Sequence, residues 1–549
     1  MLPDRPDYPS LFGDFRWPVP DRFNIGVAVA DTWAAREPGR VALYDFTEEK
    51  PRSLTFAALS QQSNRLAHVL VAAGVSPGDR VAILLPQSFE TAIAHAAIYK
   101  AGAIAVPLAV LFGVEALSFR LGHCGARAVI TDAGGAARIA ALRQNLPELQ
   151  AVFVTGNDIP AGATGFEAAM AGKPSGFDAI DTGPDDPAMM IYTSGTTGPP
   201  KGALHGHRVL LGHLPGVQMH HEFLPQEGDR LWTPADWAWA GGLLNVLLPG
   251  LYFGVPVVAA RTTKFTPQWA LDVMERAGVA NAFLPPTALK MLKTVPDPRA
   301  RRALALRTIG SGGESLGRET FVWAREQLGV TINEFYGQTE CNLVLGSCAT
   351  LGVTRPGAIG LPTPGHVVDV IDADGNPAPD GVPGQIAVRR PDPVMFLGYW
   401  KNEAATAAKF IGDWMTTGDQ GVRDPDGYVH FFGRDDDVIT SSGYRIGPGE
   451  VEDCLIGHPA IALAAAVGKP DPVRTEIVKA YVVLKPGHSP GKALEDEIRL
   501  WVRERLSAHE YPREIAFVDD MPLTTTGKVI RRVFRDRAIA EAREAAGTG

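Results

Sequence analysis

A run of small, hydroxyl-bearing and basic residues at positions 192–207 has the composition of a phosphate-binding loop. Glycines let the backbone approach a ligand closely and present its N–H groups, and a lysine adds a positive charge that suits phosphate. An apolar stretch at 188–191 precedes the run, and a strand that leads into a Gly-rich loop is a common phosphate-binding arrangement. The spacing is not that of a Walker motif, because no Gly-Lys-Ser/Thr follows. The residues expected to surround the phosphates are Thr193, Ser194, Gly195, Thr196, Thr197, Gly198 and Lys201.

Three further segments carry residue types that suit the other parts of a nucleotide. Residues 311–314, Ser-Gly-Gly-Glu, follow an apolar run, and two glycines at a strand end would let a flat base lie against the backbone. Residues 333–340 combine aromatic rings and a hydroxyl with Glu340, a carboxylate of the kind that Mg²⁺ prefers. Residues 414–419 end in Asp419, which could accept hydrogen bonds from both ribose hydroxyls. Taken alone, the first and last of these segments are more typical of ordinary turns.

Two more segments complete the pattern, at 431–446 and at 522–532. Together with the segments above, they resemble the signature of the adenylate-forming superfamily, which comprises acyl-CoA synthetases, luciferases and the adenylation domains of peptide synthetases. The resemblance extends over about residues 54–532 and is greatest to the medium-chain acyl-CoA synthetases. It implies ATP, Mg²⁺ and coenzyme A as the partners of a small carboxylic acid.

The resemblance also implies roles for individual residues. Contacts to ATP or AMP are implied for Thr193, Ser194, Gly195, Thr196, Thr197, Gly198, Lys201, Gly312, Gly313, Glu314, Glu334, Phe335, Tyr336, Gly337, Gln338, Thr339, Asp419, Arg434 and Lys528. Catalytic roles are implied for Lys528, Lys201, Glu340 and Arg445, with Glu340 as the metal ligand. Contacts to coenzyme A are implied for Ser442, Gly443, Tyr444 and Arg474. The acyl pocket is implied at Trp239 and Gly337, and the hinge between two domain orientations at Asp436.

The order of apolar and helical segments predicts an α/β fold. The first half alternates short apolar runs with helical stretches, for example a strand at 80–85 before a helix at 89–101, as in parallel α/β layers. Later Pro- and Gly-rich segments and apolar runs predict a β-rich subdomain. Three consecutive acids after Arg434 indicate a solvated boundary. We therefore expect a large N-terminal domain of layered α/β subdomains over residues 1–434 and a small, mobile α+β domain over residues 435–549.

Composition narrows the functional class. The chain has 549 residues, 45% of them hydrophobic and 21% charged, as in a soluble globular protein. Its formal net charge of −9 argues against a nucleic-acid-binding protein. The four cysteines show no metal-ligand spacing, residues 1–15 lack the pattern of a secretory signal, and no stretch approaches a membrane span. We therefore expect a cytoplasmic protein. The pair His220-His221 is expected to lie on a solvated helix face rather than in a metal site.

The resemblance implies a reaction in two steps. A carboxylate and MgATP give acyl-AMP and pyrophosphate, and the thiol of coenzyme A then displaces AMP to give acyl-CoA. The small domain would rotate between the steps, withdrawing Lys528 and presenting Gly443. No protein nucleophile is needed, and the sequence offers no Ser-His-Asp arrangement.

Two features bear on the acid. Gly337 stands where acetyl-CoA synthetases of the superfamily carry tryptophan, so we expect an open acyl pocket, gated by Trp239, that takes medium-chain, branched or aromatic acids rather than acetate. Cys341-Asn342-Leu343 departs from the Thr-Gly that commonly follows the superfamily's glutamate, which leaves the chain length open.

Other functions fit the same motifs. One alternative is an adenylating enzyme that passes the acyl group to a carrier protein, although no carrier domain is expected in the short stretch after Lys528. A second is a non-catalytic nucleotide-binding homologue, which would be expected to have lost some of these residues. Luciferase-type oxygenation would show itself as light. In many relatives the residue corresponding to Lys528 is acylated, so a lysine acyltransferase and deacylase are possible partners.

Overall fold

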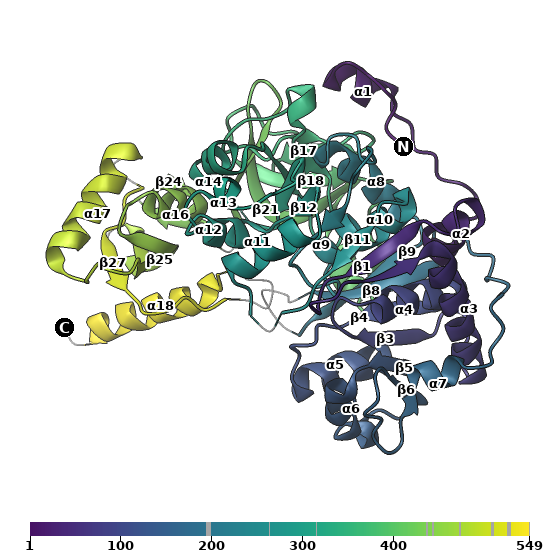
Figure 1. Ribbon diagram of the computed structural model, residues 1–549. Coiled ribbons are helices and arrows are strands. Elements are labelled where there is room, and N and C mark those ends of the chain that lie inside the picture. Colours follow the sequence, from purple (N-terminus) through teal and green to yellow (C-terminus); the bar gives the residue numbers. More distant parts are fainter. Residues whose placement is uncertain are drawn as a thin grey trace.

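The computed structural model describes residues 1–193, 199–262, 264–314, 316–434, 437–441, 444–471, 474–506, 510–523 and 529–547, and only the backbone at 440, 444, 445 and 545–547. The chain forms a large unit of packed sheets and helices, followed by a smaller unit at the left of Figure 1 that ends in α18 (Arg531–Gly547). The expected α/β fold is confirmed, because helices cover mixed sheets in the large unit and a compact α+β unit follows it.

The first sheet of the large unit carries the strands that flank the phosphate-type run. Its parallel strands β4, β3, β5 and β6 are joined by crossover helices α4 (Phe89–Lys100), α5 (Val114–Cys124) and α6 (Ala133–Ala140), as parallel pairing requires. Beyond β4 the sheet continues into β8 and then turns antiparallel. Its order in the described residues is β19 (Gly398–Tyr399), β9 (Lys201–Gly206), β8 (Pro187–Thr193), β4 (Ile104–Pro107), β3 (Arg80–Leu84), β5 (Ala126–Thr131), β6 (Ala151–Val154) and β7 (Thr164–Gly165).

The second sheet brings two of the sequence motifs to one edge. Its strands β13 and β14 are parallel neighbours, with Gly312 paired to Phe335, so the segments that follow them leave the sheet side by side. Its order in the described residues is β16 (Leu361–Pro362), β15 (Leu345–Gly346), β14 (Ile332–Tyr336), β13 (Thr308–Gly312), β12 (Asn281–Phe283), β10 (Leu231–Trp232), β11 (Val257–Ala259), β1 (Val41–Asp45) and β2 (Arg52–Thr55). Ligands of open parallel sheets bind at this carboxyl edge.

The third sheet is antiparallel and corresponds to the expected β-rich subdomain. Its order in the described residues is β17 (Val368–Ile371), β18 (Gly384–Arg389), β21 (Trp414–Arg423) and β20 (Phe410–Ile411), with β22 (Val429–Arg434) also paired to β21. The β21–β22 register sets Asp419 opposite Arg434. Two residues for which the sequence analysis implied contacts to ATP or AMP are thus neighbours because of strand pairing.

The small unit is built on a separate sheet. Its order in the described residues is β24 (Tyr444–Ile446), β23 (Ile439–Ser441), β26 (Thr475–Leu484) and β25 (Ile461–Asp471), with β27 (Glu514–Phe517) parallel to β26. Helices α16 (Pro448–Ile456) and α17 (Lys492–Arg505) enclose an apolar core that includes Val451, Leu455, Val478 and Ile498, all buried. This separate core lets the unit move as a body.

Helix α16 places the small unit against the large one. Gly317 of the large unit, at φ +79°, faces Asp453, and a Cβ there would lie 2.7 Å from the Asp453 Oδ1 atom. Glu319 lies against Gly457 in the same way. The small unit therefore rests on the segment that follows β13, beside α12–α14 in Figure 1.

Local sequence explains where the major helices begin and end. Thr55 caps α3 (Phe56–Ala72) and Ser88 caps α4, each side chain accepting a backbone N–H of the first turn. Gly125 ends α5 in the left-handed conformation at φ +65°. The other described helices are α1 (Tyr8–Asp14), η1 (Val27–Asp31), α2 (Thr32–Arg36), η2 (Arg143–Asn145), α7 (Phe166–Met170), α8 (Val209–His220), α9 (Ala240–Gly242), η3 (Leu243–Leu247), α10 (Leu248–Phe253), α11 (Pro267–Arg276), α12 (Pro286–Leu292), α13 (Pro298–Arg301), α14 (Arg318–Trp323), η4 (Ala324–Leu328), η5 (Ala349–Leu351) and α15 (Glu403–Ala407).

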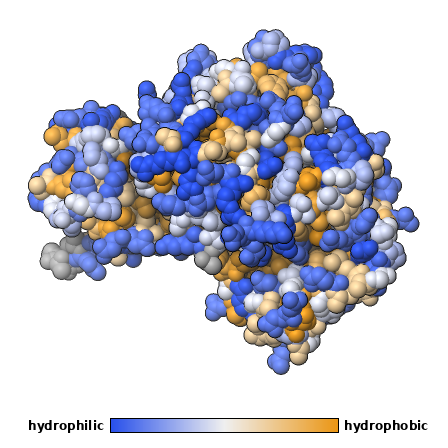
Figure 2. Space-filling model, in the orientation of Figure 1, coloured by the Kyte–Doolittle hydropathy of each residue, from blue (hydrophilic) through white to orange (hydrophobic). Residues whose placement is uncertain are grey.

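The visible surface of the molecule differs from its interior in the expected way. The face shown in Figure 2 is mostly hydrophilic, with apolar residues scattered over both units. In the described part of the chain, no helix combines the length and the apolar character needed to cross a bilayer.

Several histidines are buried in the interior. The expectation that His220-His221 faces solvent is wrong: both rings are fully buried, and His220 stacks on Phe335 at 4.6 Å between ring centroids. Helix α8 is buried along its whole length, including its histidines and its glutamine. Because these polar residues stand among apolar ones, the sequence alone does not show that they are buried too. Burial lowers the pKa of His220 to about 3, since the charged ring would be desolvated.

Further buried histidines behave alike. Burial is the leading cause that lowers the pKa values of His95 and His205 to about 3 and those of His207 and His213 to about 4. These values lie below the ordinary pKa of about 6.5 that applies to the unfolded chain. As the pH falls below 6.5, the unfolded chain therefore binds more protons than the folded protein, and stability is lost.

We predict that the melting temperature is nearly constant from pH 8 to 7 and falls steeply from pH 6.5 to 4. Each buried histidine should contribute up to about 1.4 kcal/mol per pH unit to the loss of unfolding free energy. The His95→Gln variant should lose stability less steeply, because unfolding should then take up about one proton fewer. His488→Gln, at an exposed position, should match the parent. Thermal melts over this pH range test the prediction, and equal melting temperatures at pH 7 and pH 5 would contradict it.

Candidate active site

The segment that leaves β14 carries the centre of the candidate site. Tyr336 donates its hydroxyl hydrogen to Asp419 Oδ2 at 2.6 Å, and Gln338 Nε2 donates to the same oxygen at 2.7 Å. Gln338 also donates to the Thr417 carbonyl at 2.7 Å. These bonds tie the second sheet to the third and fix the carboxylate of Asp419.

The orientation of Gln338 is itself fixed by a lysine. Lys409 Nζ donates to the Gln338 side-chain oxygen at 3.4 Å and to the Thr416 carbonyl at 2.9 Å. With the amide oxygen facing Lys409, the amide nitrogen faces Asp419. Sequence reasoning missed Lys409, whose position eight residues before Thr417 has no motif around it.

Asp419 is a buried carboxylate that still faces a cation. Its burial raises its pKa, while hydrogen bonds from Tyr336 and Gln338 and the charge of Arg434 act in the opposite direction. Arg434 Nε lies 4.0 Å from Asp419 Oδ1, across the β21–β22 ladder. A carboxylate held between donors in this way can accept hydrogen bonds from a diol in a fixed geometry.

Glu340 occupies the other end of the same segment. Tyr399 of β19 donates its hydroxyl hydrogen to Glu340 Oε1 at 2.5 Å, and the backbone N–H of Phe396 donates to the Glu340 carbonyl at 2.8 Å. Lys201 Nζ lies over the Tyr399 ring, 5.1 Å from its centroid. Tyr399 thus brings together the lysine of the first motif and the carboxylate of the third.

Tyr399 is a second residue that sequence reasoning missed. It contacts Glu340 across 59 positions of chain, and it stands in the short run Gly398-Tyr399-Trp400, whose small and aromatic residues could have drawn attention to it. Strand β19 brings it to the site by pairing with β9, where Tyr399 lies opposite Ala203, two residues after Lys201.

Two carboxyl groups lie near the ends of β13 and β14, where the sequence analysis expects the nucleotide base to bind. Glu314 accepts a hydrogen bond at 2.8 Å from the Thr287 hydroxyl, and Glu334 accepts one at 3.3 Å from the Leu316 N–H. Burial, together with the nearby negative charge of Asp453 in the small unit, raises the pKa of Glu334 to about 8. A carboxyl that is protonated at neutral pH can donate to a ring nitrogen, and a carboxylate can accept from an exocyclic amine.

Phe335 lies in the core rather than beside these groups. Its ring packs between His220 and Phe283, and a Cβ on Gly312 would lie 2.7 Å from its ring atom Cε2. Of the two neighbouring aromatic residues, Tyr336 is therefore the one whose side chain reaches the polar groups of the site.

The space beside Gly337 is not open, which corrects the expectation from the sequence. A Cβ at Gly337 would lie 2.8 Å from Asn342 Cα and closer still to the Leu343 backbone nitrogen. The chain turns back here because Leu343 adopts φ +67°. Glycine at 337 is required by this close backbone approach, and it does not by itself lengthen an acyl pocket.

Trp239 lies at the start of α9, on the first-sheet side of the site. Its ring meets Phe112 edge-on at 5.9 Å between centroids. The side chain is half-buried, which fits either packing or a gate. The predicted gating role remains a prediction.

One arginine of the small unit interacts electrostatically with a carboxyl group of the candidate site. Arg531 at the start of α18 donates to Glu452 at 2.7 Å and lies close enough to Glu314 of the large unit for the two charges to interact. Arg474 adjoins Thr475, which pairs with Ser441, so Arg474 lies near the end of β23. The side chains of Tyr444 and Arg445 are not described, and Ser194–Gly198, Asp436, Ser442, Gly443 and Lys528 lie outside the described residues.

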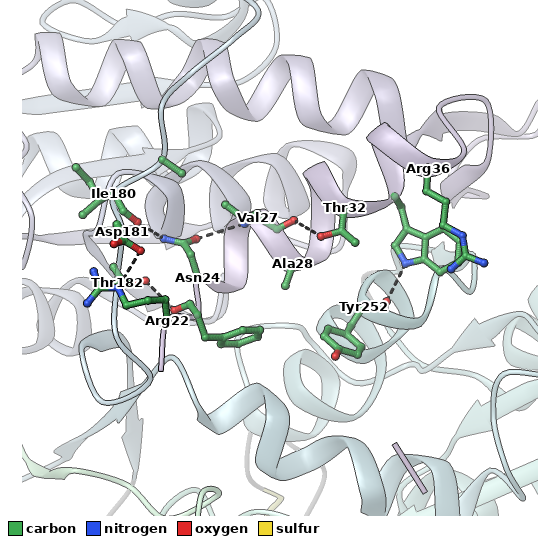
Figure 3. A pocket seen from close by; sticks show the side chains of 13 residues that line it. Arg22, Asn24, Val27, Ala28, Thr32, Arg36, Ile180, Asp181, Thr182 and Tyr252 are labelled. Carbon is green, nitrogen blue, oxygen red and sulfur yellow. Dashed lines mark hydrogen bonds and ion pairs between the residues drawn. The ribbon is translucent and has the colours of Figure 1, made fainter. Parts of the chain in front are cut away.

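A surface cleft elsewhere does not belong to this site. It has a volume of about 560 Å³ and lies between the N-terminal segment and α10 (Figure 3). Arg22 and Asp181 stand at one end of it and Arg36 and Tyr252 at the other. Its lining includes none of the residues that the sequence analysis selected.

The described donor set fits a nucleotide with a hard divalent cation. Glu340 offers an oxygen ligand beside Lys201, and Mg²⁺ commonly uses one or two carboxylates together with substrate phosphates. Among the described residues, no group of three or more His, Cys, Asp or Glu side chains could hold a metal by itself.

Comparison with known proteins decides the family. The model of the AMP-binding enzyme matches residues 30–400, and that of the AMP-binding enzyme C-terminal domain matches residues 450–528. The chain belongs to the AMP-binding enzyme family. The predicted resemblance to the adenylate-forming superfamily is thereby confirmed.

Relatives within the AMP-binding family act on different acids. The chain is 35% identical to acetyl-coenzyme A synthetase of Bacillus subtilis (strain 168), over 90% of this chain and 87% of that one. It is 33% identical to the human mitochondrial acyl-coenzyme A synthetase ACSM2B, over 94% and 91% of the two chains. The anthranilate CoA ligase AuaEII, solved with anthranoyl-AMP, superposes with a TM-score of 0.88 at 29% identity, covering 96% and 99%.

We predict that Gly337→Ala destabilises the enzyme by about 1–3 kcal/mol, because overpacking against a backbone cannot be relieved by a rotamer change. Gly337→Trp should fail to fold or aggregate, rather than change the preferred acid. Gly39→Ala is the matched control, since nothing lies within 4 Å of a Cβ at that position. Chemical denaturation measures the difference, and equal stability of the Gly337→Ala variant and the parent would show that the segment 337–343 is packed differently.

Proposed function

We propose that this chain, an ATP-dependent, AMP-forming acid–CoA ligase, adenylates a carboxylic acid on the cluster of Tyr336, Gln338, Asp419, Glu340 and Tyr399. The observation that supports this most strongly is that one segment, 336–340, bonds to the Asp419 carboxylate near one end and carries the Glu340 carboxylate at the other. The first carboxylate would suit a diol and the second a metal ion. A nucleoside triphosphate with its cation has the same two requirements.

In the first step, an oxygen of the substrate carboxylate attacks the α-phosphorus of ATP, and the bond to the β-phosphate oxygen breaks. Acyl-AMP and pyrophosphate result. Asp419 would orient the ribose, with Arg434 beside it, and Lys201 would neutralise developing charge on the phosphates. Lys528 and Arg445 would add positive charge at the reacting carboxylate and phosphate, in the roles that the family resemblance implies.

Mg²⁺, when bound with ATP, supplies positive charge that stabilises the phosphate oxygens of the transition state. Glu340 is the residue that would hold it. The hydroxyl of Tyr399 would fix the rotamer of Glu340 by its hydrogen bond to Oε1.

The second step needs a different placement of the small unit. We propose that the domains divide between residues 434 and 435 and that Asp436 is the hinge. In support, β22 ends at Arg434 in the third sheet, and β23 begins at Ile439 in the separate sheet of the small unit. Rotation about this point would withdraw the start of α18 from Glu314 and bring the segment between β23 and β24 to the site, so that Ser442, Gly443, Tyr444 and Arg474 contact coenzyme A.

The acid is proposed to be medium-chain, branched or aromatic rather than acetate. The relatives named above differ in the acid that their names give, so likeness alone selects none of them. The proposal rests instead on the apolar residues next to the candidate site, including Leu243, Leu244 and Phe283, which form one buried cluster. An apolar wall of this kind favours an acid with a hydrocarbon body.

Further parts of the proposal concern the setting of the enzyme. We propose a cytoplasmic location, and we propose that acylation of Lys528 by a lysine acyltransferase, reversed by a deacylase, regulates the first step. Removing the charge of this lysine would weaken its attraction for the reacting phosphate. The alternative acceptor is a carrier-protein thiol in place of coenzyme A.

We predict coenzyme A-dependent release of pyrophosphate and AMP with at least one acid of a panel that runs from acetate to dodecanoate and includes isobutyrate and benzoate. The preferred acid should exceed acetate by about tenfold or more in kcat/KM, since each buried methylene contributes about 0.8 kcal/mol.

The outcomes separate the alternatives. Acid-dependent exchange of pyrophosphate into ATP without coenzyme A-dependent turnover would favour the carrier-protein acceptor. Acetate as the best substrate would contradict the proposed acid class, and neither exchange nor turnover with any acid would contradict the function. Asp419→Asn should lose both exchange and turnover, whereas Asp158→Asn, at an exposed position, should keep both.

A further inference from the structure

The three residues after Glu340 depart from the family pattern and form a tight inward turn. Cys341 and Leu343 are fully buried, and Leu343 adopts φ +67°. The Leu343 side chain packs onto helix α8 at Gly216, where a Cβ would lie 3.0 Å from Leu343 Cγ. The turn is therefore held against α8, and Asn342 lies between two fully buried neighbours.

Asn342 meets a second asparagine from a different element. Its Nδ2 atom donates to Asn245 Oδ1 at 3.1 Å, and the two residues are 97 positions apart in the chain. Asn245 lies on η3, a π-helical turn, and is completely buried, with an exposed fraction of 0%. π-Helical turns occur frequently at functional sites, because they place a side chain where a regular helix would not.

The amide nitrogen of Asn245 has no hydrogen-bond partner within the described ranges. An unpaired donor in the interior is unfavourable, and native proteins keep such a group where a ligand or an ordered water completes it. The neighbours of Asn245 on η3 are leucines and valine, and they belong to the same buried cluster as Phe335 and Leu343. The Asn245–Asn342 pair is thus a polar group set in an apolar wall.

The pair also lies close to the reacting centre. Asn342 is two residues from Glu340, and its Cα atom would lie 2.8 Å from a Cβ on Gly337. Helix α9 and η3 follow directly after Trp239. An acid whose carboxylate reaches the α-phosphate would extend its body toward this wall.

We propose that Asn245 and Asn342 select carboxylic acids that carry a hydroxyl group on the acyl body. The inference rests on the proposed function, and it narrows the acid class. A side-chain amide offers a donor at one atom and an acceptor at the other, and a hydroxyl can both accept and donate, so it satisfies Asn245 in either amide orientation. A methylene or methyl group in the same place would leave the Asn245 amide unpaired.

Polar recognition of this kind discriminates more strongly than apolar fit. A site built to bind a substrate hydroxyl rejects the analogue that lacks it, because the buried protein group is then left without a partner. The pair acts on binding and not on the chemistry at phosphorus, so its effect is expected mainly in KM.

The test compares each acid with its hydroxylated counterpart: butyrate with 3-hydroxybutyrate, octanoate with 3-hydroxyoctanoate, and benzoate with 4-hydroxybenzoate. We expect the hydroxy acid to exceed its parent by about tenfold or more in kcat/KM in at least one pair. Asn245→Leu should remove this advantage, with the change mainly in the KM of the hydroxy acid. Asn281→Leu is the matched control, because it deletes another fully buried amide, bonded to Thr308, and should leave the ratio unchanged.

The wild-type ratios alone can overturn the inference, so it does not depend on a variant that folds. If the parent acids are used as well as or better than the hydroxy acids in every pair, an ordered water completes Asn245 and the inference is wrong while the proposed function stands. If Asn245→Leu unfolds, Asn245→Ser, which is smaller and polar, takes its place, and a ratio unchanged in that variant would count against the inference. If no acid supports coenzyme A-dependent turnover, the proposed function itself fails and the inference fails with it.

Discussion

The hydrogen bonds that Tyr336 and Gln338 donate to Asp419 hold the site together. They join the end of β14 in the second sheet to β21 in the third. Glu340, four residues after Tyr336, joins the same segment to β19 of the first sheet through Tyr399. Three sheets with separate hydrogen-bond ladders therefore meet on residues 336–340. Any shift of one sheet would move the Asp419 carboxylate relative to that of Glu340. The packing of the large unit therefore fixes the geometry of the candidate site.

The same segment explains why its sequence is so restricted. Gly337 admits the returning backbone of Asn342 and Leu343, and Phe335 closes the core behind it against His220. One side of the segment thus faces polar groups and the other faces packed apolar ones. A carboxyl group buried in such a place stays ionised only if donors or cations surround it. Tyr336, Gln338 and Arg434 act on Asp419 in this way.

Much of this arrangement could be predicted from sequence, and the parts that could not have a common cause. Strands such as β3 and β6 were predictable because continuous apolar runs between helices are typical of buried parallel strands. The family and its nucleotide motifs were predictable from local residue patterns. Contacts between distant segments were not: the bond from Tyr399 to Glu340 depends on the pairing of the two-residue strand β19 with β9. Neither the burial of His220-His221 nor the closed space beside Gly337 has a local signal, since both depend on what packs against them from elsewhere in the chain.

A crystal structure with AMP, Mg²⁺ and an acid would test the central claim most directly. The account predicts that both ribose hydroxyls donate to Asp419, that Glu340 ligates the cation while it keeps its bond from Tyr399, and that the base lies beside Glu314 and Glu334. Nucleotide bound elsewhere, for example in the cleft between Arg22 and Tyr252, or a ribose that does not contact Asp419, would contradict it.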